Sequence, residues 1–224
     1  MQTVLSISNL EIGYSEPLIT DFSTVLNEGG LIIFSGANGA GKSTLLKTIA
    51  GILPCKNDRI LIDNKCINQY SFEERAQKIA LVNNARISET FVSIRQMVEL
   101  GTYSILDKKE KQKLIDEALK TMNIEYLQEK NIHKISDGEW QKANVARALA
   151  QNTPIILMDE PSAFLDYPSK VNLFETIQTL SKISKKLIIV STHDIEIAQK
   201  FGTLFWHLNN KKIVTSERFV GWNI

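Results

Sequence analysis

Residues 36–44, GANGAGKST, combine the residue types and the spacing that bind phosphate. They fit the pattern G-x-x-x-x-G-K-[ST], in which glycines let several backbone N–H groups converge on one anion. A helix that begins near Lys42 adds the positive end of its dipole, and the lysine supplies a cation for the outer phosphates of a nucleoside triphosphate. The Ser43 hydroxyl is placed to ligate the accompanying magnesium ion. The predicted phosphate-binding residues are Gly36, Ala37, Asn38, Gly39, Ala40, Gly41, Lys42, Ser43 and Thr44.

The segments on either side of this loop have the order that the motif requires, a strand before it and a helix after it. The apolar run Leu31–Phe34 comes immediately before, and Leu45, Leu46 and Ile49 follow at helical spacing. An ordinary glycine-rich turn is the alternative, but such a turn needs neither segment. We therefore expect residues 36–44 to bind the phosphates of a nucleotide.

A pair of acidic residues ends the apolar run of IILMDEPSAFLD, which starts at Ile155. An aspartate at a strand end beside a phosphate loop can hold magnesium, usually through its water, and the next carboxylate can polarise the attacking water. Two solvated acids are the alternative, yet carboxylates at an apolar strand end are costly unless they serve a cation or a proton. We assign Asp159 to the metal and Glu160 to catalysis.

A second anion-binding helix start is predicted in ISDGEWQKANVARALA, residues 135–150. Ser136 is the expected N-cap, and Glu139 follows three residues later as in a capping box. The serine hydroxyl and the backbone of Gly138 can bind an anion there. Because the chain has one lysine-bearing loop but two such helix starts, we expect the second start to serve another subunit's nucleotide.

The whole chain has the pattern of an α/β core with a helical insertion. Strands are expected at residues 3–12, 21–26, 31–34, 79–82, 155–158 and 187–190, with a hairpin at 59–67. Helices are expected after the caps Ser71, Ser93, Asp107 and Ser136, near Pro168, and at residues 195–201. We predict one domain over residues 1–224, with a β-subdomain and the phosphate loop in 1–85, a helical subdomain in 86–135 and the rest of the core in 136–224.

The composition argues against a nucleic-acid partner, because 26 basic and 25 acidic residues leave a formal net charge of +1. Cys55 and Cys66 lack CxxC spacing and nearby histidines, so we interpret both as free thiols. The N-terminus lacks the pattern of a signal peptide, and no apolar run approaches the ~18 residues that cross a bilayer. We expect a soluble, cytoplasmic protein that reaches a membrane only through a partner.

Four motifs in order, GANGAGKST, ISDGEWQ, IILMDEPSAFLD and STHD, resemble those of the ATP-binding subunits of ABC transporters. The resemblance covers essentially the whole chain. It implies ATPase activity with ATP and Mg²⁺, and a P-loop NTPase core with an N-terminal antiparallel β-subdomain and an inserted ABC-type helical subdomain. It also implies a homodimer that sandwiches two ATP molecules, membrane permease subunits as partners, and a peripheral place on the inner face of the cell membrane.

The same resemblance gives roles to three further residues. It implies that His193 contacts the γ-phosphate, that Asp166 lies in a loop at the dimer interface, and that Tyr14 stacks on adenine. A lone histidine is otherwise more often a structural residue. For Tyr14, core packing stays open as an alternative, because burial and ring stacking look alike in a sequence.

The signature that reads close to LSGGQ in the family differs here at three positions. Ile135, Asp137 and Glu139 replace the leucine, the first glycine and the glutamine. Ser136 and Gly138, the positions that reach the partner's γ-phosphate, are kept. The resemblance therefore still implies the sandwich dimer, with differences that could tune how it closes.

A fourth difference follows the strand Ile79–Val82, where the family has a glutamine. This chain has Asn83 and Asn84, and we place Asn84 at that position and assign it to the magnesium site. Asparagine keeps the amide but is one methylene shorter, so contact with the ion needs a closer loop or a bridging water.

The segment VSIRQMVELGTYS and the short single domain resemble subunits of importers for iron chelates, haem or cobalamin, which also use a substrate-binding protein. The alternatives are an ABC ATPase of another transporter, a soluble ABC ATPase such as one in iron–sulfur assembly, and a P-loop kinase for a small molecule. In such importers the substrate never contacts the ATPase subunit, so the sequence leaves the substrate open.

Overall fold

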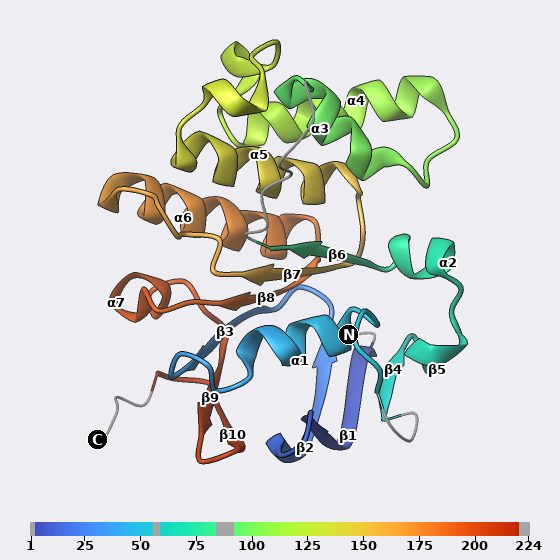
Figure 1. Cartoon of the computed structure of the whole chain (residues 1–224), viewed down its shortest axis with the longest axis vertical. Helices are drawn as coiled ribbons and strands as arrows, with labels where there is room; N and C mark the ends of the chain where they lie inside the picture. The colour runs from blue at the N-terminus through green and yellow to red at the C-terminus, as the bar shows by residue number, and fades with distance from the viewer. Residues whose placement is uncertain (1–2, 56–58, 84–91, 220–224) are drawn as a thin grey trace.

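The computed structural model describes residues 3–55, 59–83 and 92–219, which form two β-sheets and several helices that pack against them (Figure 1). In this described part, the larger sheet has six strands in the order β10-β9-β3-β8-β7-β6. Its strands are β3 (Leu31–Gly36), β6 (Ile79–Val82), β7 (Ile155–Asp159), β8 (Leu187–Ser191), β9 (Leu204–Asn209) and β10 (Lys212–Ser216). The antiparallel second sheet, in the order β2-β1-β4-β5, contains β1 (Thr3–Gly13), β2 (Pro17–Asn27), β4 (Ile60–Ile62) and β5 (Lys65–Cys66).

Strands β9, β3, β8, β7 and β6 pair in parallel, and β10 is antiparallel to β9. The register pairs Val82 with Met158, and Val190 with both Met158 and Ile33. Because the carboxyl ends of parallel strands meet at one edge, the residues that follow β3, β6, β7 and β8 gather there. The phosphate loop, Asn83, Glu160 and the STHD segment therefore share one edge of the sheet.

Both faces of the central strands of the larger sheet are buried, and β3 shows how. Leu31 and Ile33 belong to the apolar cluster that includes α5 and α6, whereas Ile32 and Phe34 belong to the cluster formed with α1 and the smaller sheet. Alternate residues of a strand point to opposite faces, so a strand covered on both faces reads as a continuous apolar run. The predicted α/β core is confirmed.

Helices cover the sheet and form the region at the top of Figure 1. They are α1 (Lys42–Ile49), α2 (Phe72–Ala76), α3 (Ile94–Glu99), α4 (Lys108–Thr121), α5 (Asp137–Ala150), α6 (Tyr167–Ile183) and α7 (Ile195–Ala198). Short 3₁₀ turns are η2 (Ile67–Gln69), η3 (Leu100–Thr102), η4 (Glu125–Leu127) and η5 (Ile132–Lys134). Within the described ranges, no helix is long and apolar enough to cross a membrane.

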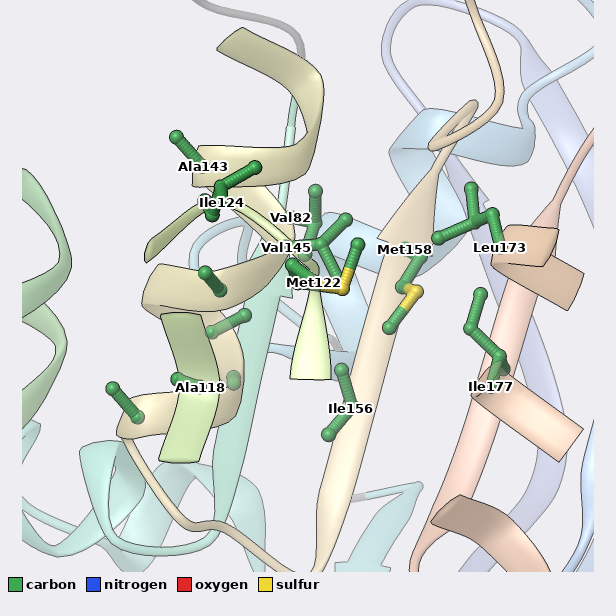
Figure 2. Close-up of a cluster of buried hydrophobic side chains, with 14 of the residues drawn as sticks. Val82, Ala118, Met122, Ile124, Ala143, Val145, Ile156, Met158, Leu173 and Ile177 are labelled. Carbon is green, nitrogen blue, oxygen red and sulfur yellow. The ribbon is translucent and has the colours of Figure 1, made fainter. Parts of the chain in front are cut away.

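Helix α5 joins the helical region to the sheet. It packs against α3 and α4 on one side, and its Val145 lies in the same apolar cluster as Val82 of β6 and Met158 of β7 (Figure 2). Met158 in turn faces Leu173 of α6 (Figure 2). The domain boundary after residue 135 stays a prediction, and α5 contacts both regions.

The structure differs from the predicted elements near the C-terminal end of the described chain. The hairpin β9–β10 was not predicted; its turn uses Asn210 and Lys211, both with positive φ. The helix predicted at 195–201 ends at Ala198, because the N–H groups of Lys200 and Phe201 bond three residues back in tighter turns. Strand β2 begins at Pro17 rather than at residue 21, since pairing with β1 extends it.

Candidate active site

The predicted phosphate loop connects β3 to α1 and is shaped by glycine. Gly39 and Gly41 have φ of 74° and 118°, which side chains other than glycine rarely tolerate. A Cβ added at Gly41 would also lie 3.1 Å from Cβ of Leu18. Among the described residues no side chain caps the start of α1 and no acid stands in its first turn. The loop therefore leaves N–H groups and the positive helix end for an anion.

Lys42 is the cation of this loop, and its side chain is almost completely buried. Its Nζ donates to the carbonyl oxygens of Gly36, at 2.8 Å, and Ala37, at 3.1 Å. Burial lowers the pKa of the ammonium, and the nearby carboxylates Glu160 and Asp159 raise it in opposition. The Lys42 ammonium is thus held at the loop by carbonyl acceptors, and phosphate oxygens can replace these acceptors.

The two acids at the end of β7 are fixed by Ser191 at the end of β8. The Ser191 hydroxyl donates to Oδ1 of Asp159 at 2.6 Å, and the backbone N–H of Glu160 bonds to both the carbonyl, at 3.1 Å, and the hydroxyl, at 3.2 Å, of Ser191. Glu160 has a φ of 51°, an uncommon conformation for this residue type. Ser191 was not predicted as a site residue, although it precedes His193 in STHD.

His193 brings the catalytic assignments into contact. Its Nε2 lies 3.0 Å from Oε1 of Glu160 and 3.3 Å from Nζ of Lys42, and its backbone N–H donates to the Glu160 carboxylate. One ring nitrogen cannot accept from the lysine and donate to the carboxylate at once, so its proton decides which contact forms. Burial raises the pKa of Glu160, and His193 and Lys42 oppose that rise. The side chains of Lys42, Glu160 and His193 therefore meet at one point.

A half-buried ion pair orients the segment that carries His193. Lys170 of α6 lies 2.6 Å from Oδ1 of Asp194, and the Ser162 hydroxyl donates to the other oxygen of Asp194 at 2.6 Å. The N–H of Asp194 bonds to the hydroxyl of Thr192 at 3.0 Å. These residues were not predicted; the acid next to His193 was the available signal.

The second predicted helix start forms a capping box. The Ser136 hydroxyl accepts from the Glu139 N–H at 3.2 Å and donates to its carboxylate at 2.9 Å, while the Ser136 N–H donates to the same carboxylate at 2.7 Å. That backbone N–H is the main reason why the pKa of Glu139 lies below its ordinary value. Ser136, Gly138 and Asp166 line one surface cavity of about 470 Å³. The structure thus brings Lys42 into contact with His193 beside Glu160, and it places Ser136 and Asp166 on one surface cavity.

Comparison with known proteins decides the family. The family described as ABC transporter matches residues 19–163, more than half of the chain. The chain belongs to the ABC transporter family. It is an ATP-binding and ATP-hydrolysing subunit of this family, as the motifs predicted.

Similar ABC proteins span most of the chain. An uncharacterized ABC transporter ATP-binding protein of Methanocaldococcus jannaschii is 33% identical over 217 residues, covering 94% of this chain and 75% of that protein. A probable siderophore transport system ATP-binding protein of Bacillus subtilis is 26% identical over 222 residues, covering 96% and 81%. The structure of cbiO1 from Clostridium perfringens, described as part of the ABC transporter complex cbiONQ, has a TM-score of 0.85 at 27% identity, with 97% and 89% covered.

The structure describes Tyr14 but not Asn84, two residues assigned from the resemblance to ABC proteins. Tyr14 is 77% exposed and lines a cavity of about 460 Å³ with Thr44 and Thr48 of α1, so the core-packing alternative is wrong. Its stacking on adenine stays a prediction. Asn84, the predicted magnesium contact, lies outside the described residues.

Proposed function

We propose that two copies of this chain sandwich two Mg²⁺–ATP molecules, and that closing the sandwich drives permease subunits importing an iron-siderophore, haem or cobalamin type of substrate. The observation that carries this proposal is the contact of Glu160 and His193 beside Lys42 at the end of the phosphate loop. A cation for the outer phosphates thus stands next to a carboxylate that can act on water.

The chain's own residues fit a magnesium ion. Ser43 is the second residue of α1, and Asp159 ends β7 at the same sheet edge, so a hydroxyl and a carboxylate are supplied. Magnesium takes few protein oxygens and completes its shell with water and phosphate, which agrees with the lack of any cluster of three acidic, His or Cys ligands in the described residues. The bound ion would neutralise charge on the phosphates.

Glu160 orients and polarises the attacking water in this proposal. A general base takes a proton from water more favourably when its pKa lies closer to the working pH. The raised pKa of Glu160 therefore suits this role. His193 leaves Glu160 to contact the γ-phosphate, and Lys42 exchanges the carbonyls of Gly36 and Ala37 for phosphate oxygens. Ser136 and Gly138 of the second copy complete the site, with Asp166 at the interface.

A permease helix is proposed to dock in an apolar groove between the core and the helical region. The groove, of about 630 Å³, is lined by Ile52, Phe72, Leu100 and Tyr103. These side chains are 58% to 78% exposed, and several large exposed apolar residues on one surface mark a protein contact site. Import of an iron chelate by this chain is supported by the siderophore transport relative.

Turnover and dimerisation of purified variants test the proposal. Glu160→Gln keeps the size of the side chain but removes the base, so we expect hydrolysis to fall at least about 100-fold while ATP produces a long-lived dimer. Lys42→Ala serves as the control that loses ATP binding, because the outer phosphates lose their cation. A Glu160→Gln chain that stays monomeric with ATP in gel filtration would contradict the sandwich.

The direction and substrate of transport need the whole transporter. The chain is co-expressed with its permease and substrate-binding protein, and membrane vesicles are prepared. These vesicles should take up a radiolabelled ferric siderophore, haem or cobalamin when ATP is supplied. Efflux, or stimulation of hydrolysis by a soluble assembly partner instead, would refute the importer assignment and leave the ATPase intact.

A further inference from the structure

Helix α5 carries two buried amide side chains one turn apart that reach the catalytic edge of the sheet. Asn144 is 0% exposed, and its Nδ2 donates to the carbonyl of Asn83 at 3.2 Å, immediately after β6. Gln141 is 1% exposed, and its Nε2 donates to the carbonyl of Glu160 at 3.5 Å, immediately after β7. One helix thus holds the carboxyl ends of two neighbouring parallel strands.

The same helix starts at Ser136, which the proposed sandwich uses for the second nucleotide. Residues three apart lie on the same side of a helix, so Gln141 and Asn144 face the sheet together. Val145 packs with Val82 and Met158 in the apolar cluster between helix and sheet (Figure 2). A shift of the helix start would therefore be transmitted to the backbone next to Asp159 and Glu160.

Asn144 carries an energetic cost at its buried position. Its Oδ1 is buried and has no hydrogen-bond partner among the described residues, so the side chain satisfies a donor but leaves an acceptor unpaired. An unpaired buried acceptor destabilises a fold, and a leucine of similar size would avoid this cost. A purely structural role does not account for an amide here, whereas holding the Asn83 carbonyl does.

Glu160 needs positioning because its backbone is in an uncommon conformation. Its N–H is held by Ser191 of β8, and its carbonyl is held by Gln141 of α5. These two elements therefore fix the peptide groups before and after Glu160, whose φ is 51°. Losing either hydrogen bond would let the carboxylate turn away from the attacking water.

We propose that Asn144 and Gln141 are positioning residues for ATP hydrolysis, which set the ends of β6 and β7 relative to the helix start at Ser136. The inference rests on the proposed catalytic role of Glu160. It predicts an effect on kcat rather than on KM, since ATP affinity comes from the phosphate loop between β3 and α1.

The experiment compares steady-state ATP hydrolysis and thermal unfolding of the full chain with Asn144→Leu and Gln141→Leu. We expect each variant to lower kcat about tenfold with KM within about twofold, since small misplacements of catalytic groups are costly. We also expect the Asn144→Leu melting temperature to equal or exceed that of the wild type.

Gln151→Leu is the matched control. Gln151 follows α5 and donates to the carbonyl of Ala76, the last residue of α2, at 2.6 Å and to that of Ile79, at the opposite end of β6, at 2.8 Å. It should lower the melting temperature and leave kcat unchanged. Unchanged kcat in both α5 variants, or an equal loss in Gln151→Leu, would overturn the inference while Glu160→Gln remains inactive. Full turnover by Glu160→Gln would overturn the catalytic assignment itself.

Discussion

Glu160 combines several unusual features of the site in one residue. Its carboxylate lies beside His193, its backbone has a positive φ, and burial raises its pKa. The positive φ and the burial of the carboxylate each cost stability in the folded chain, and such costs are found where a residue serves a reaction.

The raised pKa predicts how stability depends on pH. The folded chain binds the Glu160 proton more tightly than the unfolded chain, whose ordinary value is 4.5, so stability falls as pH rises through the raised pKa. Glu160→Gln removes this cost. Without nucleotide, we expect the variant to melt higher than the wild type near pH 7.5, with a gain that vanishes toward pH 4.5; circular dichroism melts across this range measure it. A gain independent of pH would contradict this cause.

At the level of elements, the first turn of α5 carries negative side chains where an anion is proposed to bind. Asp137 and Glu139 stand in the first turn of a helix whose start is proposed to bind a phosphate. Glu139→Gln keeps the capping box but removes a negative charge, so we expect the ATP-dependent dimer to tighten about two- to fivefold. Analytical ultracentrifugation of the Glu160→Gln background measures the dimer constant.

Glu74→Gln is the control for that prediction, because Ser71 and Glu74 form the same capping box at α2. It should leave the dimer constant unchanged. Equal constants for Glu139→Gln and its parent would show that this charge does not reach the interface.

The elements with local signals were predictable from the sequence. The capping boxes at Ser93 and Ser136 form as expected, and the hairpin turn uses Asp63 and Asn64 with positive φ. Strand β9, LFWHLN, was missed although its aromatic and apolar residues favour a strand; its place in the sheet is set by pairing with β3, some 170 residues earlier in the chain.

The site was predictable where one motif carries the chemistry and not where distant elements meet. Lys42, Glu160 and His193 were assigned from their motifs and do lie together. The Ser191 contacts and the α5 amides depend on which strands become neighbours, which the sequence does not state. Family resemblance located the first group; only the fold located the second.

At the scale of the whole molecule, the groove lined by Phe72 and Tyr103 is the surface proposed to dock the permease. We expect Phe72→Ser with Tyr103→Ser to abolish ATP-driven uptake through the permease, because both exposed apolar side chains line the groove. Hydrolysis by the isolated chain should stay within about twofold, since neither residue contacts the phosphate loop. Uptake in vesicles at wild-type rates would place the permease elsewhere.

Strand β3 separates the two apolar clusters and supplies side chains to both, Leu31 and Ile33 to one and Ile32 and Phe34 to the other. Neither half of the interior can lose its packing without exposing one face of this strand. The chain should consequently denature in a single cooperative calorimetric step, with equal calorimetric and van't Hoff enthalpies, despite its two sheets.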